Sequence, residues 1–265
     1  AALADIVPPE RISHGMRLSR FEMRGDRVEV YFENGEQVKA DLMIGADGVH
    51  SVVRQQLFGP EQARFTGRVA YRTTFPASLL EEPLMDGSCK WWGPDRHIVM
   101  YYVNPARDEV YFVTSTPEPE FKVESWSKVG NLKTLRTAYA GFNPRVCAVL
   151  DACPTVHKWA LVEREPMPRW SGDRVTLLGD ACHPMTPYMA QGASTSIEDA
   201  AVLSRVLSDI SPTGINKALD VYENARKPRT ARIQRISRLN DMEKIRAEID
   251  AVFSYNAWEV PLEGA

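Results

Sequence analysis

The segment from Arg174 to Ala201 constrains the fold of this chain most, because it joins a buried strand, a polar turn and the start of a helix. Val175 to Leu178 is a short apolar run typical of strands covered on both faces, and Gly179-Asp180 follows where that strand should end. Thr195-Ser-Ile-Glu198 fits a capping box, which predicts that a helix begins there. Open α/β sheets bind ligands at the carboxyl ends of their strands, so the segment predicts a ligand site.

Small residues lie immediately before this predicted helix. Gly192 and Ala193, followed by Ser194, would let the first backbone N–H groups of the helix approach an anion or a polar ring edge. The carboxylate of Asp180 would accept hydrogen bonds from ligand hydroxyls. The turn and the helix start together therefore predict a polar ligand-binding edge.

A second segment has the same construction. The run from Gln37 to Ile44 leads to Asp47-Gly48, and Ser51 and Arg54 follow at fixed spacings. Each motif alone is a moderate signal, but their order and separation, with strand-rich sequence between them, make the pair a strong one. The alternative is structural: Asp47 would cap a turn and Arg54 would be a solvated helix residue.

With these two motifs the chain resembles the class A flavoprotein aromatic hydroxylases, the para-hydroxybenzoate and salicylate hydroxylase group, over nearly its whole length. Gly179-Asp180-Ala-Cys-His-Pro184 is similar to the second flavin motif of that family, and Asp47-Gly48 to its Asp-Gly motif. The resemblance implies an α/β fold, α+β overall: a Rossmann-like FAD-binding domain of the para-hydroxybenzoate hydroxylase type, with an inserted, mainly antiparallel β substrate domain and C-terminal helices. The residues that it implies for FAD binding are Asp47, Gly48, Arg54, Gly179, Asp180, Pro184, Gly192, Ala193 and Ser194.

The resemblance also implies an activity. NADH or NADPH delivers hydride to FAD, and the reduced flavin reacts with O2 to form a C4a-hydroperoxide that hydroxylates an electron-rich ring. The implied substrate is a small aromatic or N-heteroaromatic compound that bears hydroxyl or carboxylate groups, with Tyr188 close to it. The run from Pro184 to Gly192 is most similar to the 6-hydroxynicotinate hydroxylases. Tyr188 stands where that subgroup has a histidine, which leaves the pyridine substrate and its decarboxylation open.

One part of the family pattern is missing. The family opens with a strand, a Gly-x-Gly-x-x-Gly turn and a helix that bind the adenosine and pyrophosphate of FAD, and no such turn occurs here. The chain starts in what looks like a helix, residues 1–7, so we expect it to lack roughly the first hundred residues of that fold. Two alternatives stay open: a non-catalytic fragment unable to hold FAD, and another flavin oxidoreductase on the same scaffold. A halogenase is disfavoured, because Lys90-Trp-Trp-Gly93 does not match the Trp-x-Trp-x-Ile signature of that class.

Composition narrows the choice of partners. A net charge of −3 with interspersed signs predicts neither a nucleic-acid nor an anionic-membrane partner, and no apolar run approaches the length needed to span a bilayer. The cysteines show no Cys-x-x-Cys pair or zinc spacing, so we expect no metal, reduced thiols and a cytoplasmic protein. A homodimer is left open.

Strand and turn signals divide the chain. Arg27 to Phe32 alternates like a half-buried strand, and from about Thr66 the pattern changes to strands separated by Pro- and Gly-bearing loops. The predicted elements of that region are strands at Val69–Phe75, Cys89–Trp92, His97–Val103 and Val110–Thr116, a helix near Ser125–Tyr139 and a strand at Trp159–Glu165. We expect a discontinuous FAD-binding domain over 1–65 and 166–210, a substrate domain over 66–165 and a C-terminal helical segment over 211–265.

A hairpin in the predicted substrate domain gathers the candidate catalytic residues. If Asn104 to Asp108 form its loop, Tyr101 faces Tyr111 and His97 lies on the same side of the sheet. Phenol and imidazole groups can hydrogen-bond an aromatic substrate and help to remove its phenolic proton, so we predict catalytic roles for these three residues and for Tyr188. The alternative is that they are ordinary sheet residues, and a one-residue slip would reverse their facing.

Other polar residues have structural interpretations. The basic series is Arg226, Lys227, Arg229, Arg232, Arg235 and Arg238. We expect it to be a solvated face rather than a pyridine-nucleotide site, with Pro228 kinking or restarting the helix. Cys182 is expected to be a small buried hydrophobe, and His183 to make either a structural hydrogen bond or a substrate contact.

Overall fold

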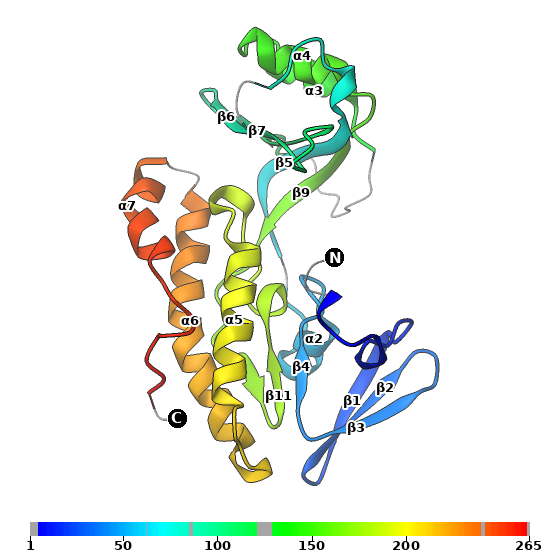
Figure 1. Cartoon of the computed structure of the whole chain (residues 1–265), viewed down its shortest axis with the longest axis vertical. Helices are drawn as coiled ribbons and strands as arrows, with labels where there is room; N and C mark the ends of the chain where they lie inside the picture. The colour runs from blue at the N-terminus through cyan, green and yellow to red at the C-terminus, as the bar shows by residue number, and fades with distance from the viewer. Residues whose placement is uncertain (1–4, 62, 85–86, 121–128, 240–241, 264–265) are drawn as a thin grey trace. The chain divides into compact units, whose positions relative to one another are not determined.

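The computed structural model describes residues 5–61, 63–84, 87–120, 129–239 and 242–263. By its internal contacts the chain forms two compact units, which we call the first unit (residues 1–62 and 164–265) and the second unit (residues 63–163). Figure 1 shows both units, each with helices and strands, as the mixed sequence pattern predicts. Residues 1–4 of the predicted N-terminal helix lie outside the described residues, and of residues 5–7 only Asp5 is helical.

An antiparallel sheet opens the first unit. Its strands, in spatial order, are β1 (Leu18–Arg24), β2 (Arg27–Phe32) and β3 (Gln37–Ala40). The bounds of β2 are those predicted from its alternation. The predicted run from Gln37 to Ile44 is wrong as a single strand, because the chain changes partner after β3 and continues as β4 (Met43–Gly45) in another sheet.

The second sheet of the first unit brings the two motifs together. Its order is β10 (Ser171–Gly172), β11 (Val175–Leu177) and β4, and β11 pairs with β4 in parallel. Leu177 lies opposite Gly45, and the backbone N–H of Leu178 donates to the carbonyl of Gly45 at 3.0 Å. Parallel neighbours end at the same edge of a sheet, so the turns that follow β4 and β11 lie side by side.

Helices complete the first unit: α2 (Val52–Phe58), α5 (Gly192–Val206), α6 (Ile215–Leu239) and α7 (Met242–Phe253). The predicted capping box is wrong. Helix α5 begins at Gly192, and the hydroxyl of Thr195 donates back to the carbonyls of Gln191 and Gly192 (2.9 Å each) instead of capping. The helix also does not restart at Pro228, which lies inside α6.

The second unit is built on one antiparallel sheet with the spatial order β6-β7-β8-β5-β9. The strands are β5 (Arg64–Pro76), β6 (Ser88–Trp92), β7 (His97–Tyr102), β8 (Glu109–Pro117) and β9 (His157–Glu163). All four strand pairs are antiparallel, which confirms the predicted sheet type. The predicted strands correspond to these elements, with differences at their ends.

One face of this sheet forms a core with two helices, α3 (Leu132–Tyr139) and α4 (Pro144–Ala152). Met100 and Phe112 from the sheet belong to the same buried cluster as Leu135 of α3 and Val149 of α4. Helix α3 corresponds to the predicted helix, whose first half falls largely outside the described residues, whereas α4 was not predicted. Among the described residues, none of the helices has the length and apolar character needed to cross a lipid bilayer.

Gly45 provides a test of the packing under the motif edge. A Cβ atom at this position would lie 2.7 Å from Cβ of Val53 in α2, which is closer than real carbon atoms approach. Gly45→Ala should therefore lower the free energy of unfolding by about 1–3 kcal/mol through overpacking. Chemical denaturation followed by circular dichroism measures this change.

Gly141→Ala is the matched control. A Cβ atom there meets nothing within 4 Å, and the backbone does not have a positive φ. That substitution should be neutral or stabilise the protein by up to about 1 kcal/mol. Equal effects of the two alanines would contradict the close approach of β4 and α2.

Candidate functional site

Asp47, directly after β4, caps helix α2. One carboxylate oxygen accepts from the hydroxyl of Ser51 at 2.5 Å, and the other accepts from the backbone N–H groups of Val52 (2.7 Å) and Val53 (3.2 Å). Gly48 has a φ of 76°, a left-handed conformation that favours glycine in the turn. The capping interpretation of Asp47 therefore describes the structure, and its predicted contact with FAD stays a prediction.

Arg54 ties the two motifs to each other. Its side chain is buried, which excludes the alternative of a solvated helix residue. One guanidinium nitrogen donates to the carbonyl of Val49 at 2.7 Å, and another donates to the carbonyl of Ala181 at 2.9 Å. The turn after β4 and the turn after β11 are thus held by a single side chain.

The turn after β11 presents Asp180. Gly179 has a φ of 64°, and a Cβ atom on it would lie 2.7 Å from Oγ of Ser196, so only glycine fits there. The side chain of Asp180 is exposed, and partial desolvation raises the pKa of its carboxyl. A Cβ atom on Gly192 would come within 3.9 Å of this carboxylate, so Asp180 lies beside the start of α5. The unpaired N–H groups of the first helical turn, at Gly192 to Ser194, therefore begin next to an exposed acid.

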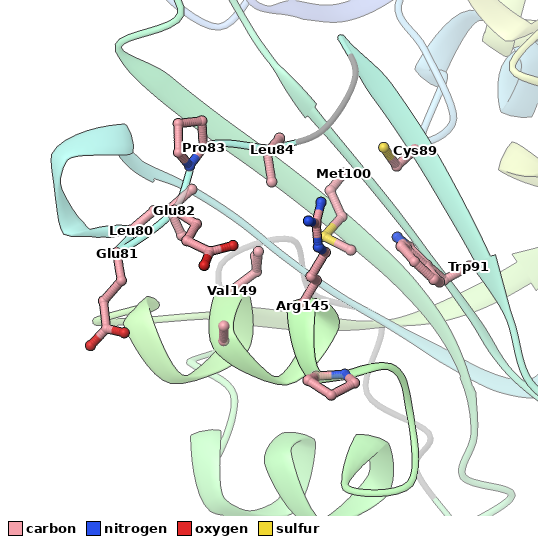
Figure 2. A pocket seen from close by; sticks show the side chains of 12 residues that line it. Leu80, Glu81, Glu82, Pro83, Leu84, Cys89, Trp91, Met100, Arg145 and Val149 are labelled. Atoms are coloured by element: carbon pink, nitrogen blue, oxygen red, sulfur yellow. The ribbon is translucent and has the colours of Figure 1, made fainter.

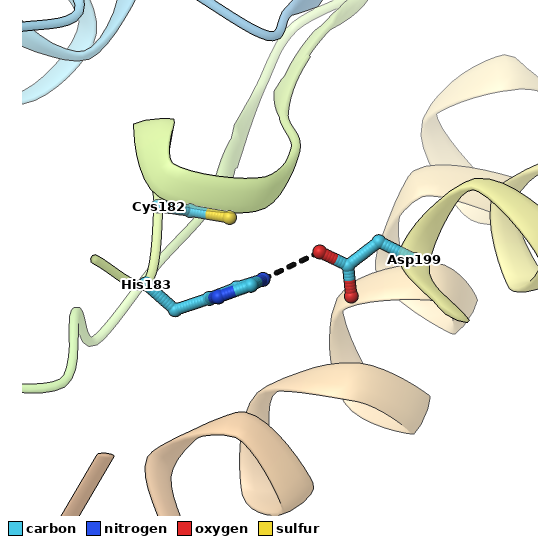
Figure 3. A group of neighbouring side chains, drawn as sticks. All are labelled: Cys182, His183 and Asp199. Carbon is cyan, nitrogen blue, oxygen red and sulfur yellow. Dashed lines mark hydrogen bonds and ion pairs between the residues drawn. The ribbon is translucent and has the colours of Figure 1, made fainter. Parts of the chain in front are cut away.

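Behind Asp180, the same turn is held by a buried ion-pair network. The carboxylate of Asp199 accepts from the backbone N–H of Gly179 (3.1 Å), from Nε2 of His183 (2.5 Å) and from Nε of Arg226 (2.8 Å). Figure 3 shows His183 directed at Asp199 across the gap between the turn and α5. The structural alternative for His183 is the one found here.

Arg226 corrects the predicted solvated face. Its side chain is fully buried and also contacts Glu198 at 2.7 Å, and Arg229 pairs with the same glutamate at 2.7 Å. The basic series was predicted from charge alone, and charge alone does not show that α5 carries Asp199 and Glu198 opposite it. At least two members of the series are therefore internal ion-pair partners.

Cys182, His183 and Asp199 place three potential metal-ligand atoms within 4.8 Å of one another. Both oxygens of Asp199 already accept hydrogen bonds, one of them from the cationic Arg226. Burial raises the pKa of the Cys182 thiol well above its usual value, which disfavours the thiolate that a metal needs. These contacts favour an ion-pair network over a metal site.

Helix α6 also fixes the turn that carries Tyr188. The amide of Gln234 donates to the carbonyl of Pro184 at 3.0 Å, and the hydroxyl of Thr186 donates to the carbonyl of Ser237 at 2.8 Å. Tyr188 follows in the short turn Pro187–Met189 and is buried. Pro184 and Tyr188 therefore lie on a turn that hydrogen bonds hold to α6.

The three other predicted catalytic residues lie together in the second unit. Tyr101 pairs with Tyr111 across β7 and β8, which confirms the predicted register, and their ring centroids are 4.9 Å apart. His97 is on the same face of β7, opposite Ser115. The apolar face of the hairpin packs into the core. The opposite face, which carries His97, Tyr101 and Tyr111, is left for polar and aromatic side chains.

His97 is a neutral imidazole at physiological pH. It is 5% exposed, and its ring lies 4.5 Å from the ring of Trp92. Burial, and then the positive charges of Lys90 and Arg68, lower the pKa of His97 to about 3. A group with such a pKa is a weak proton acceptor near neutral pH, so it is better suited to directing a hydrogen bond than to removing a proton.

The cations of this face were not predicted from the sequence. Arg72 of β5 lies opposite Val113, and its guanidinium is 4.0 Å from the ring centroid of Trp159. Burial raises the pKa of Tyr111, and the positive charge of Arg72 partly opposes this effect by lowering it. Lys90 of β6 lies 4.4 Å from the ring centroid of Trp92. The alternation of β5 could have placed Arg72 on one face, but only the pairing with β8 shows which face that is.

A separate pocket of about 220 Å³ lies on the other face of the sheet and includes none of these residues. Figure 2 shows Cys89, Trp91 and Met100 of the sheet on one side and Val149 of α4 on the other. Glu82 and Arg145 also line it, so its charges are mixed and do not select an anionic or a cationic ligand. This cavity of the second unit is therefore distinct from its polar and aromatic face.

The chain is similar to known proteins over the segments that carry both motifs. A family model described as FAD binding domain matches residues 9–237. The 6-hydroxynicotinate 3-monooxygenase of Bordetella bronchiseptica is 40% identical over 264 residues, which cover 99% of this chain and 69% of that protein. The 3-hydroxybenzoate 6-hydroxylase 2 of Aquipseudomonas alcaligenes is 37% identical over 219 residues, which cover 82% of this chain and 67% of that protein.

A solved structure agrees with these relatives. Klebsiella pneumoniae HpxO complexed with FAD and uric acid superposes with a TM-score of 0.78 at 28% identity, over 95% of this chain and 65% of that one. The chain thus spans about two thirds of the length of the proteins it matches.

The low pKa of His97 generates a prediction about acid stability. The unfolded state binds a proton at His97 below its ordinary pKa of 6.5, whereas the folded state does so only near 3. Between these values the unfolded state binds more protons, so His97 should make the protein less stable as the pH falls from 6.5 towards 3. Urea denaturation at several pH values should show a flatter acid limb for His97→Gln. An unchanged limb would contradict the buried neutral imidazole.

Proposed function

Because the chain belongs to the FAD binding domain family, and within it to the FAD-dependent aromatic monooxygenases, we propose that the full-length protein uses NAD(P)H and O2 to hydroxylate a small aromatic or N-heteroaromatic compound that bears a hydroxyl or carboxylate group. The observation that carries the proposal is the polar and aromatic face of the second unit. Tyr101, Tyr111 and His97 share it with the guanidinium of Arg72.

The residues of the first unit fit FAD. The exposed Asp180 suits the hydroxyl groups of a ribityl chain, and the N–H groups at Gly192, Ala193 and Ser194 suit the polar edge of a flavin ring. Gly179 leaves no room for a side chain beside Ser196. When bound, FAD supplies the redox chemistry: it accepts hydride from NAD(P)H and activates O2. The chain's own residues would bind and orient FAD and the substrate.

The second unit supplies the substrate contacts in this proposal. The cationic Arg72 would pair with a substrate carboxylate or phenolate, because it shares this face with Tyr111 and Tyr101. The hydroxyls of Tyr101 and Tyr111 would hydrogen-bond the substrate hydroxyl and favour its ionised form, which makes the ring more nucleophilic. Neutral His97 would direct the substrate through a hydrogen bond.

Finer points stay predictions. Tyr188 belongs to the first unit, and its predicted place beside the substrate is part of the proposal. The resemblance to 6-hydroxynicotinate 3-monooxygenase, together with a tyrosine where a histidine was expected, makes both pyridine and benzene carboxylates test substrates. A cytoplasmic location remains our prediction and agrees with four free cysteines. A homodimer is equally a prediction without a test.

Asp180 tests the assignment of FAD to the first unit. Asp180→Ala in the full-length protein should weaken FAD binding by about 1–3 kcal/mol, because it removes a charged acceptor of hydrogen bonds. Titration followed by flavin fluorescence gives the affinity. Asp26→Ala, in the exposed turn between β1 and β2, is the control and should bind FAD like the parent. Equal affinities of the parent and the Asp180 variant would refute the assignment.

The second-unit face tests the proposed activity. NAD(P)H oxidation should accelerate with salicylate, para-hydroxybenzoate or 6-hydroxynicotinate, and oxygen should enter the ring. Tyr101→Phe and Arg72→Met should raise peroxide release relative to hydroxylated product without a loss of FAD, because the substrate is held less well. The paired measurement is NAD(P)H consumption against product.

Tyr102→Phe is the matched control for that experiment. Tyr102 is the next residue of β7, on the opposite face, where its hydroxyl accepts from the backbone N–H of Leu84 at 3.0 Å. Its coupling of NAD(P)H use to product should match the parent. If Tyr101→Phe and Arg72→Met also match the parent, the face does not bind the substrate.

A further inference from the structure

Asp199 of α5 accepts hydrogen bonds from the turn that presents Asp180. It is fully buried in α5, and the same carboxylate oxygen accepts from Gly179 at 3.1 Å and from His183 at 2.5 Å. These two donors are the first and last residues of the turn, and Asp180 follows the first of them. The turn is closed on itself as well, because the backbone N–H of His183 donates to the carbonyl of Gly179 at 2.9 Å. Asp199 therefore holds both ends of the segment that carries the exposed acid, and Figure 3 shows its contact with His183.

A negative charge is needed at this position. Three donors converge on Asp199, and the third is the buried cation Arg226 at 2.8 Å. Only an ionised carboxylate offers enough acceptor sites for all three donors, since an asparagine would turn its NH2 group toward at least one of them. Breaking a buried ion pair by removing one partner leaves an uncompensated charge, so the site depends on Asp199 as an anion.

We propose that Asp199 is a positioning residue for the flavin: through Gly179 and His183 it sets the orientation in which Asp180 meets FAD. The proposal rests on the assignment of FAD to Asp180 made above. Asp199 itself is fully buried, whereas Asp180 is exposed to a ligand. The effect of Asp199 on FAD affinity must therefore pass through the turn. That effect can be distinguished from a loss of stability of helix α5.

The first test is the FAD affinity of Asp199→Asn in the full-length protein, measured by flavin fluorescence. We expect the dissociation constant to rise about tenfold or more, a factor that corresponds to about 1.4 kcal/mol. Glu198→Gln is the matched control, because Glu198 pairs with Arg226 and Arg229 in the same network. Among the described residues, its side chain makes no hydrogen bond or ion pair with the turn. Its affinity should stay within about twofold of the parent.

The second test uses His183, in case Asp199→Asn fails to fold. His183→Gln keeps an N–H donor that can reach Asp199 and should retain FAD, whereas His183→Leu should lose affinity by a similar factor. Both variants keep the Asp199–Arg226 ion pair. The comparison of the two variants therefore tests only the hydrogen bond between residue 183 and Asp199. Rescue by glutamine but not by leucine is a result that loss of packing alone would not give.

The third test combines Asp199→Asn with Asp180→Ala. If Asp199 acts through Asp180, the double variant should bind FAD no more weakly than Asp180→Ala alone, whereas independent effects would add. Additive losses, or an Asp199→Asn protein that unfolds earlier but binds FAD like the parent, would overturn the inference. Failure of the parent itself to bind FAD would instead overturn the proposed function.

Discussion

The parallel pairing of β4 with β11 is the constraint on which the first unit depends. These two strands of three residues each come from segments more than one hundred residues apart, and their pairing places Asp47 and Asp180 at one edge. So short a pair has few hydrogen bonds of its own. Arg54 supplies the missing support, since it donates to carbonyls in both turns from a buried position. The motif spacing in the sequence thus reflects a structural clamp as much as a ligand site.

The hairpin of the second unit could be predicted because local rules determine it. The loop from Asn104 to Asp108 fixes the register, and the apolar residues of β7 and β8 leave only one face for the core. Arg72 could not be predicted in the same way. Its strand is 13 residues long and pairs with β8 and β9 over long sequence separations, so nothing local determines its partner.

In the first unit, by contrast, the prediction made from the charge pattern is wrong. Arg226 stands in a run of basic residues that looks solvated, yet it is buried against Asp199. Charge patterns report the sign of a helix face but not what lies opposite it. The same limit explains the capping box: Glu198 has the right spacing for a cap, but it pairs with Arg226 and Arg229 on α6 instead. Tertiary ion pairs override local capping signals here.

The two polar assemblies of the chain differ in how they treat charge, and this difference bears on chemistry. In the first unit, the opposite charges of Asp199 and Arg226 are buried as a pair, and Asp199 also holds the turn that carries Asp180 by hydrogen bonds. In the second unit, His97 is held neutral, and burial raises the pKa of Tyr111 although Arg72 partly opposes it. A face of phenols and a neutral imidazole beside cations such as Arg72 and Lys90 leaves those cations as the strongest partners for an anionic group. Such a face favours the ionised form of a phenolic substrate without holding a charged base of its own.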